Sequence, residues 1–233
     1  MVQSLLVGLV LAQAGAKAEP GMLFAGGGGS TPPELAKRFI EACGGPEAKI
    51  LVLPQASADP GAQERNGSKT FLEGHGAKNV DVFKFTAPTK EQLEQLAKDL
   101  PSVKGIWMPG GQQGRIIERF TKLWLDANVK PLLAKGVHFY GTSAGSMVMS
   151  DPMIYGPGPE PDTSRTGPGM GLTKWVIDTH FAERKREPRL RFALKQTGAK
   201  YGLGINEREW VVIKNDEIVE RHGKALEITP EKP

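Results

Sequence analysis

The stretch that decides the fold is residues 136–149, which read GVHFYGTSAGSMVM. The apolar run at 137–140 predicts a strand, and the run at 144–149 is compatible with a helix. Between them lies GTSAG, the G-x-S-x-G pattern of a nucleophile elbow, in which a sharp strand-to-helix turn exposes the serine hydroxyl. The N–H groups that open the helix point to where an oxyanion would form. The stretch therefore predicts Ser143 as a nucleophile; a plain glycine-rich strand-to-helix turn is the alternative.

Apolar runs and helix-compatible segments alternate along the chain up to this unit. We expect strands at 22–25, 49–54, 80–85 and 104–108, and helices at 32–42, 62–74, 89–100 and 116–126. Such alternation predicts an α/β fold with a doubly wound, mostly parallel sheet and helices on both faces. Two capping boxes, Thr31 with Glu34 and Thr89 with Gln92, mark the expected starts of two of these helices.

The chain after the elbow has a weaker pattern. Residues 151–171 are rich in Pro and Gly and show no periodicity, so we expect a loop over the site. We then expect an extended segment, a helix, a short C-terminal β-hairpin and a last short strand, at 175–178, 183–197, 210–213 with 218–221, and 225–228.

Glycine-rich turns follow several of the expected strands. In doubly wound sheets ligands bind beyond the carboxyl ends of the strands. GGQQ at 110–113 and GTSAG both lie at such ends, so they should face the same crevice. GGGGS at 26–30 lacks the G-x-G-x-x-G order and the Gly-Lys-Ser/Thr ending of phosphate-binding loops. We therefore interpret it as a tight turn into the same edge of the sheet, and not as a nucleotide site.

The composition is that of one ordinary globular domain, with 233 residues of which 39% are hydrophobic and 24% charged. The net charge of +4 is mild and its Lys and Arg are interspersed with acids, so no nucleic acid is expected as a partner. The single cysteine, Cys43, excludes an internal disulfide. No apolar run beyond the N-terminal segment approaches the length of a membrane span, so we expect no membrane partner.

Residues 1–18 resemble a secretory signal peptide. Residues 4–14 are apolar or small except for Gln13, and AKA at 16–18 fits the small-x-small cleavage pattern. Cleavage there would leave a secreted or periplasmic chain that starts at Glu19. The segment ahead of the apolar run lacks Lys and Arg, so a mis-assigned start on a cytoplasmic protein is the alternative.

A serine nucleophile needs a base, and the sequence holds four histidines. His75 lies between glycines at a helix end, His138 lies too close to the elbow to fold back onto it, and His222 precedes a turn glycine. His180, in IDTHF, is followed by a segment with arginines at 184, 186 and 189. That segment fits either a solvated helix face with i,i+4 pairs or an irregular helix start whose guanidinium groups converge on a carboxylate.

Four segments, in this order, resemble the signature of the cyanophycinase family of serine peptidases (peptidase family S51), whose relatives include aspartyl dipeptidases. They are GGQQ at 110–113, GTSAG at 141–145, DTHFAERKREPRL at 178–190 and GLGINE at 202–207. The arginine-rich segment is the most specific of them. The resemblance implies a fold like that of class I glutamine amidotransferases, a flavodoxin-like arrangement, and a single peptidase domain over 19–233.

The resemblance also implies the roles of individual residues. Ser143 would be the nucleophile, His180 the general base, and Glu207 the acid that orients the imidazole. The oxyanion hole would consist of the N–H groups of Gly111 and Ala144. Residues implied to bind substrate are Gln113, Asp178, Arg184, Arg186 and Arg189. Two features depart from the family: Asn206 stands where an Asp is usual, and the loop between Ser143 and His180 is short.

The implied activity is hydrolysis through an acyl-enzyme. Arginines suit a substrate with a free α-carboxylate. Cyanophycin, a poly-aspartate with arginine on each side-chain carboxyl, would yield β-aspartyl-arginine. Small aspartyl dipeptides are an alternative substrate, and an inactive homologue that binds acidic peptides is an alternative without catalysis. No metal or cofactor motif appears, so none is expected, and the resemblance suggests a homodimer.

A lipase-like α/β-hydrolase is the remaining alternative, because it shares the elbow. Its triad follows the chain order Ser, acid, His, which only Ser143, Asp178 and His222 would satisfy. No HGGG-type oxyanion motif precedes the elbow, which argues against this class.

Overall fold

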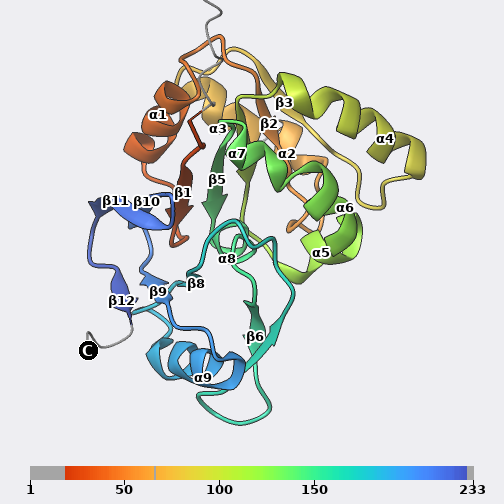
Figure 1. The fold of residues 1–233 in the computed structure, drawn as a ribbon. Coiled ribbons are helices and arrows are strands. Elements are labelled where there is room, and N and C mark those ends of the chain that lie inside the picture. Colours follow the sequence, from red (N-terminus) through yellow and green to blue (C-terminus); the bar gives the residue numbers. More distant parts are fainter. Residues whose placement is uncertain (1–18, 66, 230–233) are drawn as a thin grey trace, which may run out of the picture.

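The structure, a computed structural model, describes residues 19–65 and 67–229. Its central element is a seven-stranded sheet in the order β11-β10-β1-β5-β4-β2-β3 (Figure 1). The parallel part consists of β1 (Leu23–Gly26), β5 (His138–Thr142), β4 (Gly105–Met108), β2 (Ile50–Val52) and β3 (Val80–Val82). The predicted C-terminal hairpin is confirmed as β10 (Trp210–Lys214) and β11 (Glu217–His222). β10 pairs antiparallel with β1, and β11 pairs antiparallel with β10 at the edge of the sheet.

Side chains on both faces of β1, β2, β4 and β5 are largely buried, whereas Asp81 on the edge strand β3 is exposed. Alternate side chains point to opposite sides of the sheet. Trp107 and Tyr140 pack in one apolar cluster with α1 (Pro33–Ala42) and α3 (Ser68–Gly74). Their neighbours Ile106 and Phe139 pack in a second cluster on the other face, with α4 (Lys90–Asp99), α5 (Gly114–Phe120), α6 (Lys122–Asn128) and α7 (Pro131–Ala134). The predicted doubly wound α/β fold is therefore confirmed.

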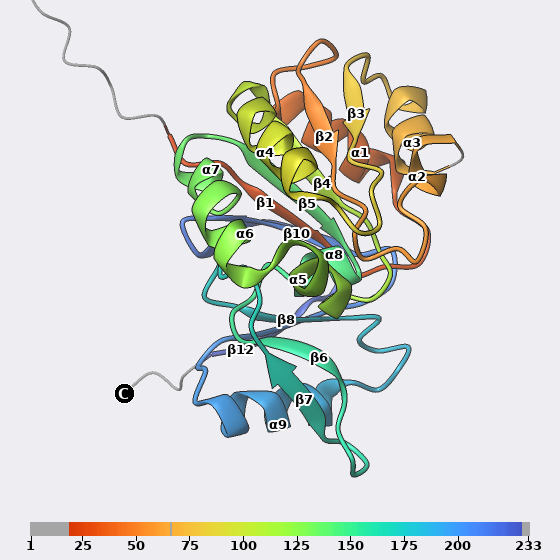
Figure 2. The ribbon, with the colours of Figure 1, turned by 90° about the vertical axis from the view of Figure 1, so that its right-hand side faces the viewer.

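A smaller layer lies beside one end of the main sheet (Figure 2). It contains a three-stranded sheet in the order β12-β9-β8, formed by β12 (Leu226–Ile228), β9 (Gly202–Ile205) and β8 (Val176–Thr179). β8 and β9 run parallel, and α9 (Glu187–Thr197) buries Leu190 and Leu194 in the apolar cluster beside them. The segment at 202–205 was not expected to be a strand, because its two glycines hide the usual strand pattern.

The expectation of an irregular loop over 151–171 was wrong. β6 (Met153–Pro157) and β7 (Ser164–Gly167) form an antiparallel hairpin there, and Met153 and Ile154 are fully buried. The register is irregular between Ile154 and Gly156. Such a bulge, together with prolines and glycines, removes the alternation by which a strand is recognised in a sequence.

Several helix boundaries also differ from the expected ones. The segment at 62–74 divides into α2 (Ala62–Arg65) and α3, and the segment at 116–126 divides into α5 and α6 at Thr121, whose φ is 62°. The helix expected from 183 begins only at Glu187, so residues 183–186 form a turn. Arg184 and Arg186 therefore lie in the turn ahead of α9 and not on the face of a regular helix.

One of the two predicted capping boxes is confirmed. The Thr89 hydroxyl accepts a hydrogen bond from the Gln92 N–H, and the Gln92 side chain accepts one from the Thr89 N–H. Thr31 makes no such cap, because α1 begins one residue later, with Pro32 as N-cap. Pro33 disfavours helical backbone at the residue before it, so Pro32 stays extended, with ψ at 134°.

The predicted signal peptide at 1–18 lies outside the described residues. Among the helices that are described, none is long and apolar enough to cross a membrane.

Candidate active site

The elbow is the turn between β5 and α8 (Ala144–Met147), with Ser143 at its tip. Ser143 has φ 53° and ψ −112°, a conformation that costs a non-glycine residue about 1–3 kcal/mol. The surrounding backbone holds it there: the Ser143 N–H donates to the Gly26 carbonyl at 3.0 Å. Close packing explains the glycines, since a Cβ on Gly145 would lie 1.7 Å from the Met108 carbonyl oxygen.

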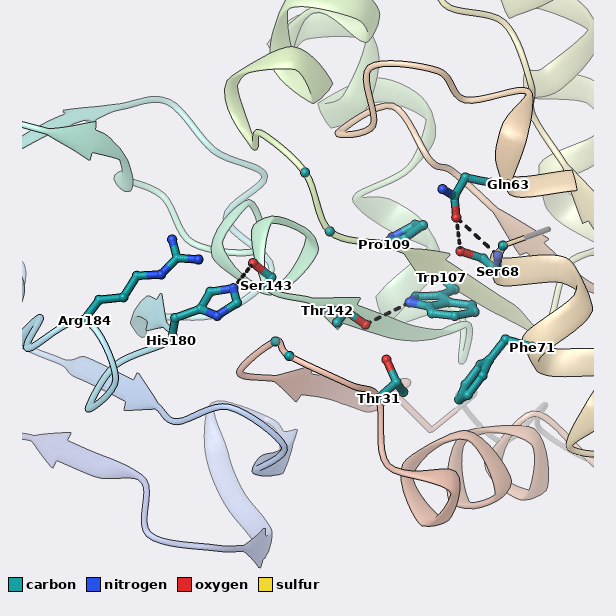
Figure 3. Close-up of a pocket in the computed structure, with 15 residues that line it drawn as sticks. Thr31, Gln63, Ser68, Phe71, Trp107, Pro109, Thr142, Ser143, His180 and Arg184 are labelled. Carbon is teal, nitrogen blue, oxygen red and sulfur yellow. Dashed lines mark hydrogen bonds between the residues drawn. The ribbon is translucent and has the colours of Figure 1, made fainter.

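Three side chains from separate elements form a continuous hydrogen-bonded chain. Ser143 Oγ lies 2.8 Å from His180 Nε2, and His180 Nδ1 lies 2.5 Å from Glu207 Oε1. Figure 3 shows the serine hydroxyl and the imidazole facing each other. His180 directly follows β8 and Glu207 follows β9, and these strands are parallel neighbours. The two loops therefore leave the small sheet at the same edge, directly opposite the elbow.

The charge on Glu207 fixes the direction of these hydrogen bonds. Its hydrogen bond to His180 lowers the pKa of Glu207, and the charges of Arg184 and Arg208 lower it further. An ionised carboxylate can only accept, so Nδ1 of the imidazole donates to it. Nε2 is then left as the acceptor for the Ser143 hydroxyl proton. The geometry is that of a nucleophile with a base held in the tautomer it needs.

Two backbone N–H groups beside Ser143 are suited to bind an oxyanion. A Cβ built on Gly110 would lie 3.6 Å from the Ser143 Cβ, which places the glycine turn after β4 against Ser143. Gly111 follows with φ 144°, and Ala144 is the first residue of α8. Within the described residues, neither of their N–H groups has a hydrogen-bond acceptor.

Two cavities meet at Ser143. The arginine cavity, of about 260 Å³, is lined by Ser143 and His180 together with Gln113, Tyr155, Arg165, Arg184, Arg186 and Arg189. The second cavity, of about 470 Å³, is lined on its far side by Thr31, Ser68, Phe71 and Trp107 (Figure 3). Arg184 and Gly111 line both. A bound peptide therefore has room on either side of the serine hydroxyl.

Asp178 does not line the arginine cavity, but its carboxylate lies beneath it and positions two of the arginines. Its carboxylate is fully buried and accepts hydrogen bonds from Arg186 and Arg189. It therefore contacts the arginines, where direct substrate binding was expected. Burial lowers the pKa of Arg186 to about 10, so the group stays protonated at neutral pH. Four guanidinium groups thus line the arginine cavity and no carboxylate of the described residues does, so the cavity is positively charged.

Gln113 lines the arginine cavity, but its amide N–H groups are already engaged. They donate to the carbonyls of Ile154 and Tyr155, at 2.6 and 3.0 Å. The side chain thereby fastens β6, one wall of the cavity. Arg184 is different, because its guanidinium forms no hydrogen bond or ion pair with the described residues and lies close to both Ser143 and His180 (Figure 3).

Comparison with known proteins identifies the family. The model of peptidase family S51 matches residues 22–221. The chain belongs to peptidase family S51. Among curated relatives, the cyanophycinase of Geminocystis herdmanii is 30% identical over 198 residues, which cover 82% of this chain and 72% of that protein. The cyanophycinase of Trichormus variabilis is 28% identical over 202 residues, which cover 82% of this chain and 66% of that protein.

Solved structures show the same fold as this S51 peptidase at low identity. A peptidase from an acI-B1 actinobacterium has a TM-score of 0.61 at 16% identity, covering 93% of this chain and 97% of that one. A putative peptidase E of Listeria monocytogenes has a TM-score of 0.61 at 17% identity, covering 88% and 100%.

Sequence reasoning missed the role of the glycine loop at 26–29 in this S51 chain. The Gly27 carbonyl accepts from the His180 N–H at 2.8 Å, and the Gly28 carbonyl accepts from the Arg208 N–H at 2.9 Å. A Cβ on Gly28 would lie 2.5 Å from the imidazole of His180. The loop therefore packs directly against the imidazole of His180. The run of four glycines was the sequence feature that could have indicated this close backbone contact.

The contacts of Asn206 explain why an amide stands where the family signature usually has an Asp. Its Oδ1 accepts from the Ala182 N–H, and its Nδ2 donates to Glu209 Oε2 and to the Lys224 carbonyl, at 2.9 and 3.1 Å. An aspartate could not donate to Glu209, so the amide suits these neighbours. Across the described part of the chain, no group of three or more His, Cys, Asp or Glu side chains is placed to hold a metal ion.

Gly28→Ala is expected to lower kcat about 10²-fold, because the added methyl group must displace the imidazole. Gly44→Ala is the matched control: Gly44 has a similar φ of 107°, against 100° at Gly28, but a Cβ there meets nothing within 4 Å. Steady-state kinetics and thermal unfolding of both variants separate backbone strain from displacement of His180. Equal activity of the two variants would contradict the assigned role of the loop.

Proposed function

We propose that the chain hydrolyses peptides through an acyl-enzyme on Ser143. His180 takes the hydroxyl proton as Oγ attacks the scissile carbonyl, because a serine hydroxyl is a weak nucleophile at neutral pH. Glu207 holds the imidazole tautomer and stabilises the imidazolium that forms. The N–H groups of Gly111 and Ala144 bind the oxyanion, and His180 then protonates the leaving amine. Water releases the acyl group by the same steps.

The observation that supports the substrate class is the arginine cavity, which opens directly beside Ser143. Guanidinium groups bind carboxylates with paired hydrogen bonds, so the acyl side of the substrate carries a carboxylate. An aspartyl residue presents one within reach of its scissile amide. Fixing that group holds the carbonyl carbon at Oγ, which raises the rate by positioning.

Cyanophycin is the substrate that the names of the curated relatives favour, and its product would be β-aspartyl-arginine. Small aspartyl dipeptides are a second candidate that one observation favours. Neither cavity is lined by Asp or Glu among the described residues, so the guanidinium of a cyanophycin side chain would find no acidic partner.

The test is incubation with insoluble cyanophycin and, separately, with a panel of α- and β-aspartyl dipeptides, read by mass spectrometry. Release of β-aspartyl-arginine supports the polymer as substrate. Turnover of dipeptides alone supports the second candidate. Failure to hydrolyse any aspartyl substrate overturns the proposed specificity.

Arg184→Met is expected to raise KM about tenfold or more for substrates with a free α-carboxylate, because each hydrogen bond to a charged group contributes about 1.5–3 kcal/mol. Lys185→Met is the matched control: it removes the neighbouring cation, which lines neither cavity at Ser143. Kinetics on one dipeptide with a free carboxylate and on its carboxamide measure the effect. A KM rise of the same size for both substrates would contradict a carboxylate contact.

A further inference from the structure

Two arginines of α5 bind a short backbone loop that the proposed reaction leaves without a role. Arg119 Nη1 donates to the carbonyls of Gln55 and Ser57, at 2.8 and 2.6 Å. Arg115 Nη1 donates to the Ala56 carbonyl at 3.3 Å. The two arginines are four residues apart, so they lie on one face of the helix. Three consecutive carbonyls, at 55–57, thus receive guanidinium hydrogen bonds.

This loop lies directly against the glycine turn that carries a proposed oxyanion donor. The Ala56 carbonyl also accepts a hydrogen bond from the Gln112 N–H at 2.9 Å. A Cβ on Gly111 would lie 2.2 Å from the same carbonyl oxygen. The position of the 55–57 backbone therefore limits where Gly111 can lie, and with it the direction of the Gly111 N–H.

Arg119 has no carboxylate partner among the described residues, although it is half-buried. Burial lowers the pKa of Arg119, and the charge of Arg115 lowers it further. A half-buried guanidinium without an ion pair loses hydration that only its hydrogen bonds replace. Here these bonds all go to the 55–57 loop, so the side chain is committed to holding that loop in place. The far side of the loop is held by Gln55, whose Nε2 donates to the Phe83 carbonyl at 2.6 Å.

We propose that Arg119 is a positioning residue for the oxyanion hole, acting through the 55–57 loop on Gly111. This inference rests on the proposed reaction, because it assigns the Gly111 N–H to the oxyanion. Oxyanion donors stabilise the transition state only when they are already aimed at the developing charge. Loosening the loop therefore weakens transition-state binding and leaves the ground state, held in the arginine cavity, almost unchanged.

The test compares wild type with Arg119→Met, Arg119→Lys and Arg38→Met. Arg38 is a matched control: it is also half-buried, and its guanidinium is bound to Glu220 on β11, outside both cavities at Ser143. Two quantities are measured: kcat and KM per titrated active site on a hydrolysed aspartyl dipeptide, and the second-order rate of Ser143 labelling by a fluorophosphonate. The phosphonyl oxygen of that probe occupies the oxyanion hole without using the arginine cavity.

Arg119→Met is expected to lower kcat and the labelling rate about tenfold or more, less than the 10²–10³-fold loss from removing a donor, with KM changed by less than about twofold. Arg119→Lys is expected to recover part of this, because an ammonium can reach one carbonyl, and Arg38→Met is expected to match wild type in both rates. A folded Arg119→Met with unchanged kcat and labelling rate overturns the proposal. A loss that disappears on active-site titration does so too, because it reflects stability alone.

If Arg119→Met does not fold, the proposal is tested with Arg119→Lys and Arg115→Met, by their kcat and their rate of fluorophosphonate labelling. A wild type that hydrolyses no aspartyl peptide but labels on Ser143 contradicts the proposed substrate only, and the labelling rates still decide the role of Arg119. A wild type that does not label overturns the positioning role as well.

Discussion

Ser143→Ala is expected to lower kcat for aspartyl-peptide hydrolysis about 10⁶-fold, the loss seen when the nucleophile of such a triad is removed. The dissociation constant of the substrate should stay close to that of wild type. The carboxylate contacts come from the arginine cavity, and the alanine adds no bulk at the elbow. Kinetics and calorimetric titration of the same preparation measure both quantities.

Retained turnover by Ser143→Ala would sink the assignment of the nucleophile. Lost turnover together with lost substrate affinity would show instead that the elbow had changed shape. We do not expect the elbow to change shape in Ser143→Ala. The Ser146 hydroxyl donates to the carbonyls of Gly26 and Gly141, at 2.8 Å each, and holds the turn independently of the Ser143 side chain.

Glu207→Gln is expected to lower kcat about 10⁴-fold with little change in KM, as for the corresponding change in a Ser-His-Asp triad. The amide is neutral, so the imidazolium loses its counter-charge. Its N–H can also donate to Nδ1, which moves the imidazole proton to Nε2 and blocks proton transfer from Ser143. Measurement of kcat and KM on the best dipeptide tests this.

Glu183→Gln is the matched control for Glu207→Gln. The Glu183 carboxylate accepts a hydrogen bond from the Glu207 N–H at 3.2 Å and does not touch the imidazole. The variant therefore removes a charge of the same sign nearby while a side-chain oxygen can still accept that bond. Comparable losses in both variants would show that local charge matters and that the contact to His180 does not.

The central sheet was predictable because its parallel strands are short, mainly apolar runs, three of which (β1, β4 and β5) end in glycine-rich turns. The elbow was predictable for the same reason, since GTSAG fits only a turn with small residues on both sides of Ser143. The Thr89 cap was predictable because a capping box is local. The capping box predicted at Thr31 was wrong, because Pro33 keeps the preceding Pro32 extended and the helix begins only after it.

In the smaller layer, β8, α9 and β12 were predicted with slightly shifted ends, but β9 and β6 were not predictable from local pattern. β9 contains two glycines and β6 is bulged, so neither shows the alternation of a strand. β9 is held by pairing with β8 and β12, and β6 by pairing with β7 and packing against β8 and α9. Asp178 was misplaced for a related reason. The family resemblance implied that Asp178 binds substrate, but the alternation along β8 turns its side chain away from the surface, beneath the arginines.

The role of the glycine loop at 26–29 could not be predicted from the sequence. Its composition fits a phosphate loop, a tight turn or a close backbone contact, and only the approach of β8 and β9 selects the last. Gly27 and Gly28 contact residues more than 150 positions later in the chain, so no local pattern could reveal their role.

The most direct test of the central claim is to map the site of a fluorophosphonate adduct by peptide mass spectrometry, with and without competing aspartyl dipeptide. We expect one adduct per chain, on Ser143, which the dipeptide suppresses and which His180→Ala no longer forms. An adduct on another serine, or a folded chain with no adduct at all, would contradict the claim that Ser143 is the nucleophile.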